Sequence, residues 1–160
     1  MKEERFVGVI SDTHGLLRPE AVDAMRGAEQ IVHAGDVGRG DILETLEKLA
    51  PVTAVRGNVD HAGRPATLPE TAVLEWNGAT IYVLHDLDQL DLIPAAAGFG
   101  AVVFGHSHHP LVDARDGVLF LNPGSAGPRR FRLPVTVARL MRRENGLHAE
   151  IVPLTLPPGR

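Results

Sequence analysis

The sequence AVVFGHSH at residues 101–108 places two histidines, His106 and His108, directly after an apolar run. The run is typical of a buried strand, and Gly105 indicates a loop at its end. Packing alone gives little reason for two imidazoles at such a strand end, whereas imidazole is the commonest metal ligand among side chains. This stretch therefore predicts a metal site, and the other strands are expected to supply its remaining ligands.

The composition is that of an ordinary globular protein. Hydrophobic residues make up 44% of the 160 residues and charged residues 22%, values that suit one folded domain over residues 1–160. The formal net charge of -4 and the 4% aromatic content argue against a surface that tracks long nucleic acid. Because the chain has no cysteine, any metal must be bound by nitrogen and oxygen ligands.

No export or membrane segment is expected. The apolar run at residues 6–10 is too short for the core of a signal peptide. No apolar run reaches the length of a membrane span. By elimination, we expect a cytoplasmic protein without membrane contact.

The first half of the chain alternates strand-like and helix-like segments, and the second half is mostly hairpins, one of them around the strong turn signal Asn77-Gly78. Strands are expected at 6–10, 30–33, 52–55, 71–76, 80–84, 101–104, 111–114, 118–121, 135–141 and 147–152. Helices are expected at 20–26, 42–49 and 89–97, and a loop at 61–70. This pattern predicts an α/β fold in which two mixed β-sheets pack as a sandwich flanked by helices.

Polar side chains that bind metals follow five of the apolar runs. In layered α/β folds the loops at strand ends converge, and ligands bind there. The candidates are Asp12, His14, Asp36, Asn58, His85, His106 and His108. Two carboxylates, four imidazoles and one amide are too many ligands for one tetrahedral zinc ion. They suit two ions about 3.5–4 Å apart that share one carboxylate.

The ordered set of motifs resembles the calcineurin-like metallophosphoesterase superfamily. The motifs are Asp12-x-His14, Gly35-Asp36, Gly57-Asn58-x-Asp60, His85 and Gly105-His106-x-His108. The short chain and the runs Ser-Asp-Thr-His-Gly, His-Ala-Gly-Asp, Arg-Gly-Asn and Asn-Pro-Gly-Ser are similar to the small bacterial and archaeal phosphodiesterase branch. The resemblance covers about residues 6–125 and implies the four-layer sandwich of that superfamily.

The resemblance also implies a role for each ligand. The first ion is held by Asp12, His14 and His108, the second by Asn58, His85 and His106, and Asp36 bridges both. A hydroxide between the ions attacks phosphorus in line, and Asp36, Asn58 and His106 act in catalysis through that hydroxide and the position of the phosphate. Manganese is the expected metal, with iron, zinc and nickel as alternatives.

Two positions depart from the superfamily pattern. Larger relatives carry a histidine after the Gly-Asn pair that is thought to protonate the leaving group or bind phosphate, and here that position is Val59. We therefore expect a preference for activated, aryl-type esters. Relatives usually have His-Gly-His where this chain has His85-Asp86-Leu87, so Asp86 is expected to shape the pocket edge or to contact a ligand residue.

Several residues near the motifs have both a functional and a purely structural interpretation. Asp60 is expected to orient a ligand histidine, and Ser125 either contacts phosphate or serves only the Asn-Pro-Gly-Ser turn. His61 and His109 either face the substrate or lie in solvent. His33 is expected to hydrogen-bond the backbone at its strand end and not to bind metal.

The sequence thus predicts a metal-dependent phosphoesterase, more specifically a phosphodiesterase that acts on a small phosphodiester or nucleotide-like substrate. The alternative is a catalytically weak scaffold for a protein partner, because a retromer subunit with this fold acts chiefly in that way and a fold does not prove a function. A nuclease for long DNA or RNA is disfavoured by the acidic charge and the few aromatic residues. Because relatives often pair, we also expect a homo-oligomer.

Overall fold

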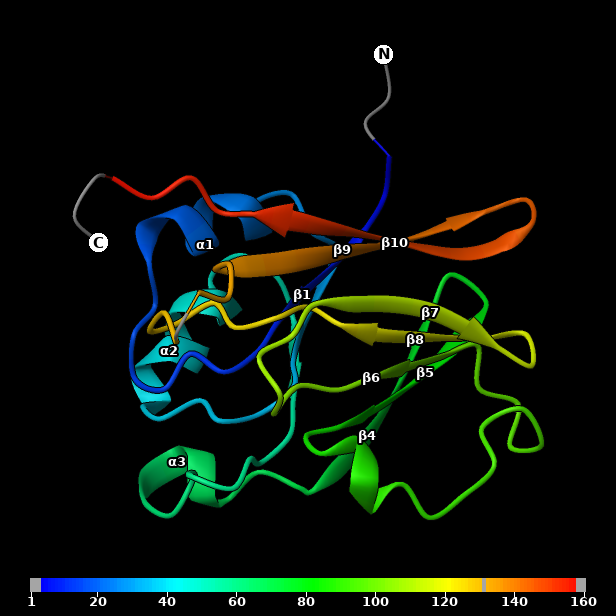
Figure 1. The fold of residues 1–160 in the computed structure, drawn as a ribbon, viewed down its shortest axis with the longest axis horizontal. Coiled ribbons are helices and arrows are strands. Elements are labelled where there is room, and N and C mark those ends of the chain that lie inside the picture. The colour runs from blue at the N-terminus through cyan, green and yellow to red at the C-terminus, as the bar shows by residue number, and fades with distance from the viewer. Residues whose placement is uncertain (1–3, 131, 158–160) are drawn as a thin grey trace.

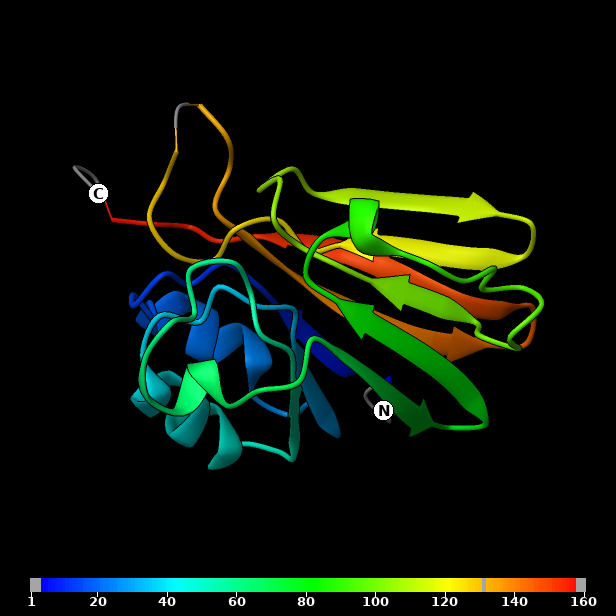
Figure 2. The ribbon, with the colours of Figure 1, turned by 90° about the horizontal axis from the view of Figure 1, so that it is seen from below.

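The computed structural model describes residues 4–130 and 132–157, which form two five-stranded β-sheets packed face to face (Figure 1, Figure 2). The first sheet has the strand order β10-β9-β1-β2-β3 and consists of β1 (Val7–Ile10), β2 (Gln30–His33), β3 (Val52–Ala54), β9 (Thr136–Arg143) and β10 (Gly146–Pro153). The second sheet has the order β4-β5-β6-β8-β7 and consists of β4 (Thr71–Trp76), β5 (Ala79–Leu84), β6 (Ala101–Val103), β7 (Leu111–Arg115) and β8 (Val118–Asn122).

Each sheet contains three parallel strands, which antiparallel strands extend. In the first sheet β1, β2 and β3 are parallel, and β9 and β10 continue the sheet in antiparallel pairs on the other side of β1. In the second sheet β5, β6 and β8 are parallel, and β4 and β7 are antiparallel strands at the two edges. The predicted α/β sandwich of two mixed sheets is therefore confirmed.

Helices cover the outer face of the first sheet (Figure 2). α1 (Pro19–Met25) connects β1 to β2, α2 (Gly40–Glu47) connects β2 to β3, and the short α3 (Gly63–Ala66) follows β3 inside the predicted loop. Pro suits the first position of α1, because a backbone N–H there would have no partner within the helix. Among the described residues, no helix combines the length and apolar character needed to span a membrane.

The outer face of the second sheet is covered differently, and the helix predicted at 89–97 is wrong. The segment forms one 3-10 turn, η1 (Leu87–Gln89), and then an irregular chain that leads to β6. Pro94 has no backbone N–H and disfavours the helical conformation at the residue before it, so a helix cannot continue through this stretch. Apolar side chains such as Leu90 and Phe99 still bury the face, and the Phe99 ring stacks on Tyr82 at 5.0 Å between centroids.

Two apolar layers bury both faces of the first sheet. Between the sheets, Val9 and Val32 face Ile81 and Leu121, and all four side chains are fully buried. On the other face, Ile31 and its neighbours pack against α1 and α2. Burial on both faces explains why β1, at the middle of the sheet, is a continuous apolar run and does not alternate with polar residues.

The loops after the parallel strands of both sheets meet at one edge of the sandwich. The backbone N–H of Ala126, beyond β8, donates to the carbonyl of Ser11, beyond β1, at 3.0 Å. The backbone N–H of Gly105, beyond β6, donates to the carbonyl of His85, beyond β5, at 2.9 Å. The predicted ligand residues, which follow five of these six parallel strands, are therefore brought to the same edge although they are far apart in the sequence.

The inter-sheet layer provides the test of this architecture. Leu121→Ala is expected to lower the free energy of unfolding by about 2–5 kcal/mol, because a fully buried side chain leaves a cavity. Val73→Ala, at a position that is 55% exposed on β4, is the control and should change it by less than about 0.5 kcal/mol. Urea denaturation measures both values, and equal effects would contradict the packing described above.

Candidate metal centre

Strained backbone marks the loops that carry the predicted ligands. Five of the seven residues have a left-handed conformation, with φ of 56° at Asp12, 46° at His14, 55° at Asp36, 72° at His106 and 63° at His108. This conformation costs a residue with a Cβ about 1–2 kcal/mol, and such strain gathers at functional sites. The surrounding contacts must therefore hold these five residues in place.

Two motif glycines permit the close approach of the ligand loops. A Cβ atom at Gly57 would overlap the carboxylate and the backbone of Asp36. A Cβ atom at Gly105 would overlap Ser11 and would lie 2.6 Å from Oδ2 of Asp12. Both glycines are therefore explained by contacts between loops of different strands, where no larger residue fits.

The first ligand group contains Asp12, His14 and His108, whose ligand atoms all lie within 4.8 Å of one another. Nε2 of His108 is 3.4 Å and Nε2 of His14 is 3.6 Å from Oδ1 of Asp12. Oδ2 of the same carboxylate accepts hydrogen bonds from the Ser11 hydroxyl at 2.7 Å and from the His106 amide at 3.1 Å. Burial by itself raises the pKa of Asp12, but the imidazoles of His108 and His14 outweigh burial and hold this pKa well below its usual value.

The second group contains Asp36, His85 and His106, and Asn58 lies among them. Oδ1 of Asn58 is 3.0 Å from Nε2 of His85 and 3.1 Å from Nδ1 of His106. The carbonyl of Ala34 lies 2.7 Å from Nδ1 of His85 and accepts its N–H. Since a neutral imidazole has one N–H, this bond leaves a lone pair on Nε2 that faces the oxygens of the group.

Asp36 lies between the two groups. Its Oδ2 is 3.2 Å from Nε2 of His85 and 3.5 Å from Nε2 of His14, while its Oδ1 accepts the backbone N–H of Val59 at 3.0 Å. Burial raises the pKa of Asp36, but His85 and the Val59 amide outweigh it, and the pKa is lowered. For His85, burial lowers the pKa, but Asp36 and Asp12 beside it prevail and the pKa is raised.

The donor atoms fit divalent cations. Oδ1 of Asp12 is buried and has no hydrogen-bond partner among the described residues, and the Nε2 atoms of His14 and His108 lie only 3.3 Å apart. In the second group, Nε2 of a neutral His85 faces two oxygens that cannot donate to it. A cation in each group would offset the repulsion among these lone pairs. Carboxylate, imidazole and amide donors suit manganese, iron, zinc and nickel.

A buried histidine joins the loops of the two groups. Nδ1 of His33 accepts the backbone N–H of Gly35 at 3.1 Å, and its Nε2 lies 3.0 Å from the hydroxyl of Thr13. That hydroxyl donates to the carbonyl of Val37 at 2.8 Å, so it accepts from Nε2–H of His33. Burial lowers the pKa of His33 to about 4, which keeps the ring neutral in this network. The predicted backbone bond of His33 is present, and the ring also fixes Thr13.

Asp60 was predicted to orient a ligand histidine, but its hydrogen-bond partners are backbone amides. Its carboxylate is 3% exposed and accepts three backbone N–H groups at 2.9 to 3.2 Å, from Gly57, Gly38 and Val37. Among the described residues it makes no hydrogen bond to a ligand histidine. Because its partners belong to two loops, Asp60 links the loop of Asp36 to the loop of Asn58.

Ser125 also has a backbone partner. Its hydroxyl is 3% exposed and donates to the carbonyl of Asp12 at 3.0 Å, so the alternative of a phosphate contact is not favoured. Asp86 lies at the pocket edge, as one of its two predicted roles requires, and accepts the backbone N–H of Asp88 at 3.0 Å. His61 is exposed and lines the same pocket, and His109 is exposed on the loop after His108.

Three polar side chains that hold the ligand loops were not predicted. The hydroxyls of Ser11 and Thr13 bind Asp12 and Val37, and both residues flank the first ligand in the sequence. The amide of Asn122 donates to the Gly105 carbonyl and to the Ser107 hydroxyl, each at 3.1 Å. Adjacency to a ligand and the Asn-Pro-Gly-Ser turn were the only available sequence signals for them.

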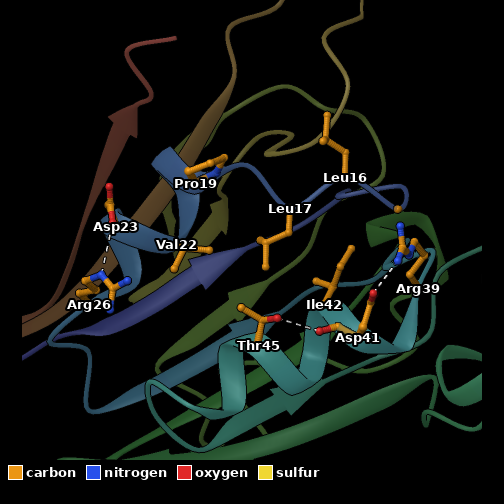
Figure 3. A pocket seen from close by; sticks show the side chains of 11 residues that line it. Leu16, Leu17, Pro19, Val22, Asp23, Arg26, Arg39, Asp41, Ile42 and Thr45 are labelled. Atoms are coloured by element: carbon orange, nitrogen blue, oxygen red, sulfur yellow. Dashed lines mark hydrogen bonds and ion pairs between the residues drawn. The ribbon is translucent and has the colours of Figure 1, made fainter. Parts of the chain in front are cut away.

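Two surface cavities lie near these loops. One, of about 550 Å³, borders the second ligand group, because Asn58 and His85 form part of its wall. The other, of about 520 Å³, lies between α1 and α2 and is lined by side chains such as Val22 and Ile42 (Figure 3). None of the seven predicted ligands lines this second cavity. Of these two cavities, the one beside Asn58 borders the candidate metal centre.

The chain belongs to the calcineurin-like phosphoesterase superfamily, whose domain model matches residues 6–145. The resemblance found from the motifs is thus confirmed. This is a metal-dependent family, and the two ligand groups described above are its candidate metal-binding residues here.

Similar proteins agree with this assignment. A probable metallophosphoesterase of Methanocaldococcus jannaschii is 36% identical over 162 residues, which cover 93% of this chain and 81% of the relative. A phosphodiesterase of the same organism is 24% identical over 136 residues, 74% of this chain and 82% of the relative. The structure of Vacuolar Protein Sorting 29 from Cryptosporidium parvum superimposes with a TM-score of 0.71 at 18% identity, covering 97% of this chain and all of the other, and shows the shared fold.

The buried His33 predicts how stability depends on pH. Its pKa is about 4 in the folded protein and about 6.5 in an unfolded chain, so the unfolded state binds more protons between these values. Stability is therefore full above pH 6.5 and is lost as the pH falls toward 4, by about 3 kcal/mol from this residue. Chelator-treated protein, scanned by calorimetry from pH 7.5 to 4.5, should show a falling Tm.

The matched variant is His33→Asn, whose side-chain oxygen can replace Nδ1 as the acceptor for Gly35. It should be less stable than the natural protein at pH 7.5 but should lose less of its stability on acidification. An equally steep pH dependence in both proteins would show that His33 is not the group responsible.

Proposed function

We propose that this protein is a phosphodiesterase that uses two divalent metal ions, manganese first among them, to hydrolyse small phosphodiesters. The observation that carries the proposal is the meeting of two ligand groups around one carboxylate, with Oδ2 of Asp36 3.2 Å from His85 and 3.5 Å from His14. The similarity to a phosphodiesterase of Methanocaldococcus jannaschii supports a diester as the substrate.

The proposal assigns the ligands as the resemblance implied. One ion would be held by Asp12, His14 and His108, the other by Asn58, His85 and His106, and Asp36 would serve both. Bound ions of this kind supply Lewis-acid activation of a water nucleophile and neutralise charge on the phosphoryl oxygens. The net reaction adds the water oxygen to phosphorus and breaks the bond from phosphorus to one ester oxygen.

The contribution of the protein itself is preorganisation. The Ala34 carbonyl fixes the tautomer of His85, and the Ser11 hydroxyl and the His106 amide orient the carboxylate of Asp12. Asp60 binds the loops of the second group through their backbone amides. Because these contacts already exist in the folded chain, little reorganisation is needed when charge develops on the substrate.

The position that carries a histidine in larger relatives supplies no proton to the leaving group here. It is Val59, which follows the Gly-Asn pair, is 39% exposed and donates its backbone N–H to Asp36. An aliphatic side chain donates no proton, so departure of an alkoxide is unassisted from this position. Esters of acidic alcohols, such as phenols, are therefore the proposed preferred substrates.

The second candidate function is a scaffold for a protein partner. The similarity in fold to Vacuolar Protein Sorting 29 supports this candidate. A scaffold could lose metal ligands and still bind its partner. The seven candidate ligands form two adjoining groups, and the carboxylates of Asp12 and Asp36 are buried among them. This arrangement supports the enzyme. The two candidates differ in whether a folded, metal-loaded protein turns over a diester.

The first test uses bis(p-nitrophenyl) phosphate and chelator-stripped protein. Added manganese should restore hydrolysis, because the ligand groups need a cation, and His108→Ala should reduce the rate by about 100-fold or more. His148→Ala is the control, since that ring bonds Asn145 at 2.7 Å on the β9–β10 hairpin, away from the ligand groups. Release of p-nitrophenolate, followed by absorbance, is the measurement.

Metal binding is tested separately by thermal unfolding. At a metal concentration about 100 times Kd, the Tm of the natural protein should rise by about 5–10 °C, and that of His108→Ala by much less. A folded protein that binds manganese, iron, zinc or nickel but turns over no diester would contradict the enzyme and favour the scaffold.

A gain-of-function variant tests the explanation of the leaving group. Val59→His should raise the hydrolysis of an alkyl phosphodiester by about 100-fold, the size of general acid catalysis, and leave bis(p-nitrophenyl) phosphate within about threefold. Val59→Asn is the control for polarity without a proton-transfer group. Equal gains on both esters, or natural rates that are equal for aryl and alkyl diesters, would show that Val59 does not limit the reaction.

A further inference from the structure

The cavity beside the second ligand group has a wall that the proposed chemistry does not use. It is formed by the loop after β3, the start of β4, the end of β5 and the segment around η1. Asn58 and His85 lie on the side of the ligand group, and Asp86 and Asp91 lie on the wall next to η1. At about 550 Å³, the cavity is large enough for one alcohol arm of a small diester.

Charge on this wall is predominantly negative. The carboxylates of Asp60, Glu70, Asp86 and Asp91 line the cavity, and Arg56 is the one lysine or arginine in its described lining. The guanidinium of Arg56 is already engaged, because it donates to Glu70 at 2.7 Å and to the Ala66 carbonyl at 3.3 Å. A second phosphate or a carboxylate on the substrate would therefore meet repulsion here.

The carboxylates of the wall differ in what they already bind. Asp60 is satisfied by three backbone amides, and Glu70 is paired with Arg56. Asp86 accepts one backbone N–H through Oδ1, and Asp91 is exposed at the rim. Asp86 and Asp91 are thus the two carboxylates with capacity for a charged group that enters the cavity.

The wall also lacks the features that bind other kinds of alcohol arm. Its described lining contains no phenylalanine, tyrosine or tryptophan on which a nucleobase could stack, and Leu84, its one large aliphatic side chain, is 3% exposed. A nucleobase or a long alkyl chain would find little complementary surface. A cation would find carboxylates.

We propose that this cavity holds an ammonium-bearing alcohol arm of the phosphodiester, and that Asp86 and Asp91 determine that specificity. The inference rests on the proposed function, since it places the phosphate at the candidate metal centre and one ester arm in the adjoining cavity. The proposed substrate class is therefore a phosphodiester of an amino alcohol. Further phosphates of a nucleotide would meet repulsion from Asp86 and Asp91.

The test compares two esters of the same shape, p-nitrophenyl phosphocholine and p-nitrophenyl 3,3-dimethylbutyl phosphate, which differ by a quaternary nitrogen in place of a carbon. In both, the water oxygen bonds to phosphorus, the aryl ester bond breaks, p-nitrophenolate leaves with the bonding electron pair, and the released protons go to solvent. The choline ester should have the higher kcat/KM by about tenfold, and the ratio should fall as salt is added.

Variants assign the selectivity to the wall. The double variant Asp86→Asn with Asp91→Asn should bring the ratio of the two kcat/KM values to about two or less, while asparagine keeps the oxygen that accepts the Asp88 amide. The matched control, Asp116→Asn with Glu144→Gln, removes the same charge from hairpin turns at the opposite ends of the sheets. It should leave the ratio unchanged.

A binding measurement gives a readout apart from turnover. By calorimetry on the manganese-loaded protein, phosphocholine should bind about tenfold more tightly than 3,3-dimethylbutyl phosphate, and the double variant should lose the difference. A ratio near one in the natural protein, or one that survives in the double variant, overturns the inference. Bis(p-nitrophenyl) phosphate separates the two failures: no turnover refutes the proposed function, whereas turnover without selectivity refutes only the role of the cavity.

Discussion

The structure depends on holding two carboxylates, Asp12 and Asp36, against imidazoles at the edge where six strand ends meet. Burial and mutual repulsion both oppose ionisation of this pair, and Asp12 is among the causes that raise the pKa of Asp36. Neighbouring imidazoles and backbone amides outweigh these effects, so both acids remain charged. Buried charges and lone pairs are costly unless they are paired, so the strained backbone, the close-packed glycines and the buried hydrogen bonds all gather where this pairing is made.

The two ligand groups are not equivalent. In the first group, Asp12 and His108 are buried and His14 is partly buried, so its ion would be enclosed by protein. In the second group His106 is exposed, and the acidic cavity begins at Asn58. A substrate would thus approach from the side of the second group. Under the proposed function, the metal ion and the ester arm would be bound by adjoining parts of the chain, because Asp86 directly follows His85.

Most of the strands were predictable, because they depend on local patterns. The apolar run buried on both faces predicted β1, and Asn77-Gly78 predicted the first hairpin. The prediction of a helix at 89–97 was wrong. The apolar side chains of this segment cover the second sheet without forming a helix, and no periodic pattern in the sequence distinguishes such a segment. The prediction that Asp60 binds a ligand histidine was wrong for a related reason. Its backbone partners Val37 and Gly38 lie on another loop, which only folding brings close to it.

Residue types and strand ends thus follow from the chain alone, because periodicity and turn chemistry act over a few residues. The distances between the ligands do not. His14 and His108 are 94 positions apart, yet their ring nitrogens lie 3.3 Å from each other because β1 and β6 end at the same edge of the sandwich. The charge of the cavity wall arises in the same way, since Glu70 precedes β4 and Asp86 follows β5. Sheet pairing and sheet packing set these distances, and both are long-range interactions that no local pattern in the sequence encodes.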